Sequence, residues 1–283
     1  MTAGSPAAFG VAVLVGLLSG LHAATWGMYK DSPYEGFSTA KYLRSPLVGM
    51  GAALCLQAIM RFDLASPAGL LMLFGLSYAL ERALVESHKS FIRVEDQAKY
   101  FIPMAFAVGG RVVASRALRA GAGLAYVGAI ALVIAGLHYG GRSGVEIHPL
   151  AGLLLAGTAG GWLSAFGGAW KDAPKEGFQL LKFFRSPAIA LVYALALASL
   201  TTSWLVISFG ALGLTVATIE TRKTFGTTDA PGKFRGKPIL FPEALLLRRR
   251  FVPVFIAVWV LVLTALVAAL ANPRGGLLDA AWP

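Results

Sequence analysis

The sequence contains little charge for its length and almost no cysteine. Of its 283 residues, 14% are Asp, Glu, Lys or Arg, 57% are hydrophobic, and the mean hydropathy is +0.68. A soluble domain usually carries about 25% charged residues, so this composition excludes an ordinary soluble protein and indicates an integral membrane protein. The one cysteine, Cys55, cannot form an internal disulfide, and its apolar surroundings predict a small buried side chain.

Several kinds of chemistry are excluded because their motifs are missing. The sequence has no Cys/His cluster at zinc spacing, no His-Glu-x-x-His, no Gly-x-Ser-x-Gly and no cysteine pair for redox work. Its basic loops are short and lie between apolar runs, whereas nucleic-acid binding is typical of a soluble basic face with aromatic residues. We therefore expect no nucleic-acid partner.

Long apolar runs are what the sequence has in abundance. A bilayer core of about 30 Å is crossed by about 20 apolar residues in a helix, and helices satisfy their own backbone groups at that depth. We therefore expect an all-α polytopic membrane protein with eight transmembrane helices, at residues 8–28, 46–61, 66–86, 120–138, 149–169, 187–202, 204–221 and 251–271.

A charged motif occurs twice, after the first and the fifth of these runs. Lys30-Asp31-Ser-Pro-Tyr-Glu35-Gly-Phe is followed by Lys41, Arg44 and Ser45-Pro46, and 141 residues later Lys171-Asp172-Ala-Pro-Lys-Glu176-Gly-Phe is followed by Lys182, Arg185 and Ser186-Pro187. This repetition predicts two tandem repeats of four helices, residues 1–145 and 146–283. Because each repeat has an even number of spans, the two should be parallel and related by an axis along the membrane normal.

The basic residues predict the orientation in the membrane. The loops after the first, third, fifth and seventh runs contain 21 of the 25 lysines and arginines. Short loops rich in Lys and Arg stay in the cytosol. We therefore expect a multi-pass protein of the cell (inner) membrane with both termini outside the cytosol and both motif copies on the cytosolic side.

One interpretation of the motif is purely architectural. Asp31 and Asp172 would be N-caps of short interfacial helices, and Ser45-Pro46 and Ser186-Pro187 would begin the next spans. The lysines and arginines would then set topology, reach the headgroups and contact anionic lipid.

The other interpretation is a binding site. Arg44 and Arg185 would stand just before helix N-termini, which attract anions. The candidate substrate-binding residues are cationic: Lys30, Lys41, Arg44, Lys89, Lys171, Lys182, Arg185 and Lys223. The candidate catalytic residues and Mg2+ ligands are the four carboxylates of the motif, Asp31, Glu35, Asp172 and Glu176, because hard oxygen ligands hold Mg2+ against phosphates. If the loops meet at the two-fold axis, these groups form one cytosolic entrance for a phosphate-bearing substrate.

Three functions follow from this interpretation. The first is a lipid- or prenyl-phosphate transferase or modifying enzyme, dependent on Mg2+. The arrangement is similar in outline to the UbiA-type prenyltransferases, which pair two four-helix units over a cytosol-facing acidic site, although their aspartate-rich motifs are absent here. The alternatives are a transporter or carrier of an anionic metabolite or lipid, and a non-catalytic membrane subunit that docks a cytosolic partner. Expected partners are membrane lipids and a phosphate-bearing small molecule or lipid, and a homo-oligomer is left open.

Overall fold

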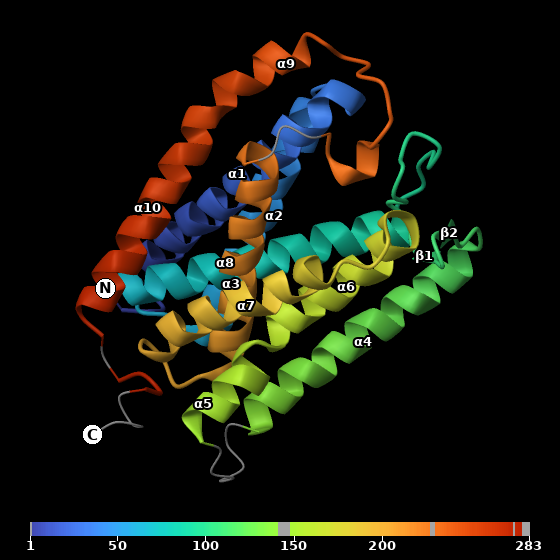
Figure 1. Ribbon diagram of the computed structural model, residues 1–283. Coiled ribbons are helices and arrows are strands. Elements are labelled where there is room, and N and C mark those ends of the chain that lie inside the picture. The colour runs from blue at the N-terminus through green and yellow to red at the C-terminus, as the bar shows by residue number, and fades with distance from the viewer. Residues whose placement is uncertain (1, 141–147, 227–229, 274, 279–283) are drawn as a thin grey trace.

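The computed structural model describes residues 2–140, 148–226, 230–273 and 275–278. The regular structure in these ranges is helical apart from one antiparallel hairpin, β1 (Ala107–Val108) and β2 (Arg111–Val112) (Figure 1). Eight helical segments of the described chain are long and apolar enough to cross a membrane, so the expectation of an all-α multi-pass membrane protein is confirmed at this level.

Each predicted span overlaps a helix, although several boundaries differ. The helices and short helical turns are α1 (Pro6–Glu35), α2 (Thr39–Met60), α3 (Pro67–Ser87), η1 (His88–Ile92), α4 (Arg116–Gly140), α5 (Pro149–Gly152), η2 (Leu153–Gly157), α6 (Ala159–Glu176), α7 (Leu180–Ala198), α8 (Trp204–Phe225), η3 (Gly232–Phe234), α9 (Ala244–Leu247), η4 (Arg248–Phe251) and α10 (Val252–Ala271).

Serine residues define the starts of four long helices. The side chains of Ser5, Ser38, Ser66 and Ser203 each accept a hydrogen bond from a backbone N–H three residues further on. These bonds satisfy donors that have no partner inside the helix. A capping serine therefore fixes the first residue of α1, α2, α3 and α8.

The architectural prediction for Asp31 and Asp172 is wrong, because neither residue caps a new helix. α1 runs through the first motif copy to Glu35, and α6 runs through the second copy to Glu176. Pro33 lies inside α1 and supplies no N–H to the carbonyl of Tyr29. Arg248 replaces that bond, since its Nη1 donates to the Tyr29 carbonyl oxygen at 2.9 Å. The motif thus forms the last turns of a long helix and not a separate interfacial helix.

The predicted starts of the following spans are also wrong. α2 begins at Thr39 and α7 at Leu180, so Pro46 and Pro187 lie inside these helices. Arg44 and Arg185 therefore sit in the second turn, away from the free N–H groups of the first turn. Any attraction that they exert on an anion comes from the guanidinium and not from a helix end.

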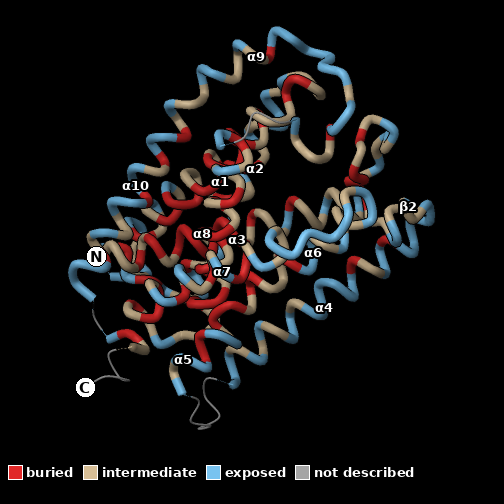
Figure 2. Tube along the Cα trace, viewed as in Figure 1, coloured by how far each residue is buried: buried red, intermediate tan, exposed pale blue. Residues whose placement is uncertain are grey.

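The core lies where α1, α3 and α8 pack together, and Figure 2 shows the buried residues gathered there. α3 and α8 meet at glycines: a Cβ added to Gly75 would lie 2.7 Å from the carbonyl oxygen of Gly210, and one added to Gly213 would overlap the backbone of Gly75. α10 packs against α1 and α3, while α6 and α7 pack against each other and against α8. α4 lies at the outside and is mostly exposed, although Arg119 and Gly123 near its start are buried (Figures 1 and 2).

Two further expectations concern residues outside this core. The expected boundary between residues 145 and 146 lies outside the described residues. Cys55 was expected to be buried, but it is exposed on α2. α2 contacts α1 and α3, and Cys55 lies on a face that these contacts leave open, which in a membrane meets lipid.

Candidate functional site

Each motif copy turns the chain sharply between two long helices. Gly36 ends α1 with φ 73°, and Gly177 ends α6 with φ 80°. Residues with a Cβ rarely adopt these values, so the glycine of the motif is required by the turn. The turn brings the Lys and Arg of the following helix back beside the acidic residues of the preceding one.

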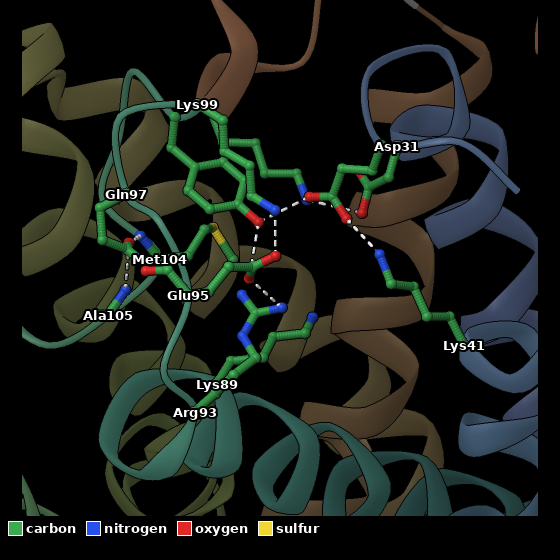
Figure 3. Close-up of polar contacts among 12 residues, drawn as sticks. Asp31, Lys41, Lys89, Arg93, Glu95, Gln97, Lys99, Met104 and Ala105 are labelled. Atoms are coloured by element: carbon green, nitrogen blue, oxygen red, sulfur yellow. Dashed lines mark hydrogen bonds and ion pairs between the residues drawn. The ribbon is translucent and has the colours of Figure 1, made fainter. Parts of the chain in front are cut away.

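The first copy forms what we call the first pocket. Asp31 and Glu35 of α1 and Lys41 and Arg44 of α2 line it. Other elements complete the lining with Arg82 of α3, Lys89 of η1, and Arg93, Tyr100 and Lys233. Figure 3 shows the charged ends of Lys41, Lys89, Arg93 and Asp31 in this region.

The second copy forms a second pocket at the corresponding place. Asp172 of α6 and Lys182, Arg185 and Ser186 of α7 line it, as Asp31, Lys41, Arg44 and Ser45 line the first. Glu220 and Lys223 of α8 complete its charged lining. These pairs are separated by the same 141 residues as the two motif copies, so the lining is repeated along with the sequence.

The predicted site residues are therefore divided between two pockets, which differs from the single entrance that we expected. The first pocket is lined by five of them: Asp31, Glu35, Lys41, Arg44 and Lys89. The second is lined by four: Asp172, Lys182, Arg185 and Lys223. The other three have different neighbours: Lys30 pairs with Glu220, Lys171 donates to the sulfur of Met104 at 3.4 Å, and Glu176 pairs with Lys182 and Arg235.

All four motif carboxylates bond cations. In the first pocket, Asp31 Oδ2 lies 2.7 Å from Lys233 Nζ and Glu35 Oε2 lies 3.4 Å from Lys41 Nζ. In the second copy, Lys182 Nζ lies 2.7 Å from Asp172 Oδ2 and 2.8 Å from Glu176 Oε2. These ion pairs neutralise the carboxylates, so any ligand must be bound alongside them.

This donor set does not fit Mg2+ in the arrangement seen. Asp31 Oδ1 is buried and has no hydrogen-bond partner among the described residues, but the other oxygen of the same carboxylate faces an ammonium group. The described residues contain no cluster of three or more His, Cys, Asp or Glu side chains that could hold a metal ion. Mg2+ therefore stays a prediction from the sequence.

Arg44 and Arg185 differ from the other basic residues of the pockets. Each is half-buried, and the Nε of each is shielded from solvent with no hydrogen-bond partner in the part of the chain that the structure describes. Within the same residues, neither guanidinium has a carboxylate at ion-pair distance. Because no carboxylate neutralises them, these two guanidiniums are the groups of the pockets with which an anionic ligand would pair best.

A basic segment from the C-terminal half joins the two copies, although none of its residues was among those predicted for the site. Lys233 pairs with Asp31, and Arg235 Nη2 lies 3.1 Å from Glu176 Oε1. Between them Phe234 is buried and stacks on Tyr34 at a centroid distance of 4.3 Å. The alternation of basic and aromatic residues at 233–235 could have indicated a binding segment, but it does not reveal which acids the basic residues contact.

Tyr100 was also missed, and it lies at the centre of a small polar network. Its hydroxyl donates to Glu35 Oε1 at 2.8 Å and lies 3.1 Å from Glu95 Oε2. Burial raises the pKa of Tyr100, and its hydrogen bond to Glu35 and the charges of Glu35 and Glu95 raise it further. Burial alone would raise the pKa of Glu95, but the bond from Lys99 and the charge of Arg93 outweigh it and lower that pKa. The hydroxyl therefore stays protonated and donates to the pocket carboxylate.

Comparison of the chain with protein-family models, with curated proteins and with solved structures gives no match in any of the three.

Proposed function

We propose that this protein binds the phosphate groups of membrane lipids or prenyl phosphates in its two pockets and acts as a lipid- or prenyl-phosphate transferase or modifying enzyme. The observation that carries the proposal is the repeated pocket. Arg44 and Arg185 lie at equivalent positions in it, and both have a shielded guanidinium nitrogen without a partner. A planar guanidinium matches the geometry of phosphate oxygens, and Lys41 and Lys182 add charge nearby.

The position of the pockets suits a lipid substrate. The helices beneath them are apolar and long enough to cross a membrane. Large apolar side chains are exposed beside the second pocket, with Phe178 at 60% and Leu181 at 88% exposure. A phosphate bound at the arginine would therefore leave its apolar chain next to bilayer lipid and not in water.

We also propose that the chain consists of two parallel repeats of four spans, residues 1–145 and 146–283. Support comes from the equivalent linings of the two pockets and from α3 and α8, the third spans of the two halves, which meet glycine to glycine. Lys30 of the first half and Glu220 of the second bond at 2.8 Å, which requires both to lie at the same end of the bundle, as parallel halves place them.

Orientation in the inner membrane can be tested with single cysteines, because Cys55→Ser leaves the chain without any cysteine. Lys175 and Ala65 are exposed, near the pockets and at the turn between α2 and α3 respectively. We expect a cysteine at Ala65 to react with a membrane-impermeant maleimide on intact cells, and one at Lys175 to react only after permeabilisation. The opposite labelling pattern would place the pockets outside the cytosol.

Phosphate binding can be tested with full-length protein in detergent. We expect Arg44→Gln and Arg185→Gln each to weaken binding of a short-chain phosphatidic acid about tenfold, since a charged hydrogen bond is worth about 1.5–3 kcal/mol. The ligand-dependent rise in Tm measures this, with and without Mg2+. Arg249→Gln, which removes an exposed arginine, is the matched control. If lipid phosphate shifts Tm equally in all four proteins, the pockets do not bind it.

An anion carrier is the second candidate, because two equivalent pockets suit the same ligand in both halves. The two functions differ in outcome: an enzyme converts the phosphate-bearing lipid, whereas a carrier moves it or an anionic metabolite across the bilayer unchanged. Product analysis and flux of a labelled anion in proteoliposomes therefore separate them. A protein that binds without either outcome is a docking subunit.

A further inference from the structure

The two pockets share their motif residues but not the residues that other elements contribute. Six basic and two acidic side chains line the first pocket, against three basic and two acidic ones in the second. The difference is largest for arginine, since the first pocket has Arg44, Arg82 and Arg93 and the second has Arg185. The first pocket therefore offers a ligand more cationic side chains, and more guanidinium groups, than the second.

The two halves of the sequence show where the two linings differ. Glu86 and Lys89 of the first half correspond to Glu220 and Lys223 of the second, and at the same spacing Arg82 corresponds to Val216 and Tyr100 to Phe234. Val216 lines the second pocket, as Arg82 lines the first. An arginine in one half is thus replaced by an apolar residue at the equivalent position of the other.

The additional arginines are held in place by acids outside the lining of the pocket. Arg82 pairs with Glu81 at 3.6 Å and also with Glu86, and its guanidinium lies over the ring of Trp26. Arg93 Nη1 lies 2.6 Å from Glu95 Oε2. A guanidinium has five N–H donors, so the two acids on Arg82 and the one acid on Arg93 fix the orientation of these groups and still leave donors for another anion.

We infer that the pockets are specialised, and that the first takes a diphosphate group while the second takes a single phosphate group. This inference rests on the proposed function, because it names the ligand of each phosphate pocket. A diphosphate has more oxygens and more charge than a phosphate monoester, and several guanidiniums together match it best. The second pocket, with one arginine and two lysines, matches a single phosphate group.

Soluble probes test the inference on the full-length protein in detergent. Inorganic pyrophosphate and orthophosphate are titrated by calorimetry at fixed ionic strength, because salt screens the binding of both anions. We expect wild-type protein to bind pyrophosphate at least tenfold more tightly than orthophosphate. Arg93→Gln should remove the preference for pyrophosphate. Arg185→Gln should weaken orthophosphate binding but leave the preference for pyrophosphate in place.

Two further variants distinguish a loss of binding from a folding defect. Arg93→Lys retains a cation for Glu95 but loses the planar fork, so it should fold normally and still lose most of the preference. Val216→Arg places in the second pocket the arginine that the first has, and we expect an additional pyrophosphate site. Helix content by circular dichroism is measured for every variant.

The outcomes separate the inference from the proposed function. If wild-type protein binds neither probe nor phosphatidic acid, the proposed function fails, and the inference fails with it. If both probes bind with equal affinity, or if Arg185→Gln and not Arg93→Gln removes the preference, the pockets still bind phosphate but are not specialised as inferred.

Discussion

Gly213→Ala should destabilise the folded protein strongly, although it adds only one methyl group. The new Cβ would overlap the backbone carbonyl of Gly75, where α3 and α8 cross in the core. A flexible side chain could move aside, but backbone on a packed helix cannot, so the two helices must separate. Close approach of this kind is what small residues provide between membrane helices. We expect a loss of about 3 kcal/mol, at the upper end of overpacking effects.

The measurement is the yield of monodisperse protein in detergent and its thermal stability. Gly128→Ala is the matched control, because Gly128 lies in α4 and a Cβ there would meet nothing within 4 Å. The control should be neutral or slightly stabilising, since alanine favours helix over glycine. Equal stability of the two variants would show that α3 and α8 do not approach as closely as the structure has them.

Glu220→Gln should have the next largest effect, because Glu220 joins the two halves. Its oxygens lie 2.8 Å from Lys30 Nζ and 3.1 Å from Lys223 Nζ, and its side chain is 14% exposed. Removing the carboxylate leaves the Lys30 ammonium, itself 15% exposed, without its acid. Breaking a largely buried pair in this way costs about 3 kcal/mol.

A double-mutant cycle distinguishes this pair from a general loss of charge. The double variant Lys30→Gln, Glu220→Gln should lose less unfolding free energy than the sum of the two single variants, by about 1 kcal/mol or more. The reason is that the second change removes a charge that the first has already left without its partner. Thermal unfolding of the four proteins gives the coupling, and Glu243→Gln, at an exposed acid, should leave Tm unchanged. Additive single costs would mean that the two halves do not meet through these residues.

The membrane class and the approximate positions of the spans could be predicted from the sequence because they depend on local properties. Eight apolar runs each satisfy their own backbone in helical form, whatever their neighbours are. The ends of the helices were less predictable. Asp31 was expected to cap a new helix, whereas α1 continues past it and past Pro33 to Glu35. The carbonyl that the proline leaves free accepts a bond from Arg248, far away in the chain.

The candidate site shows the same division. Repetition in the sequence was enough to single out Asp31, Lys41 and Arg44 and their counterparts, because the same residue types recur at the same spacing in both copies. It could not show that Lys233 neutralises Asp31, or that Tyr100 donates to Glu35, since those partners come from other segments of the chain.

The sequence by itself determined the class of the protein, the number of spans and the duplicated motif, because hydrophobicity, helix formation and repetition are properties of short segments. Tertiary structure alone decided that the motif forms two pockets, which acids are already neutralised, and which arginines keep a donor without a partner. The physical reason is that ion pairs and buried donors depend on distances between segments that lie far apart in the chain, and only packing sets those distances.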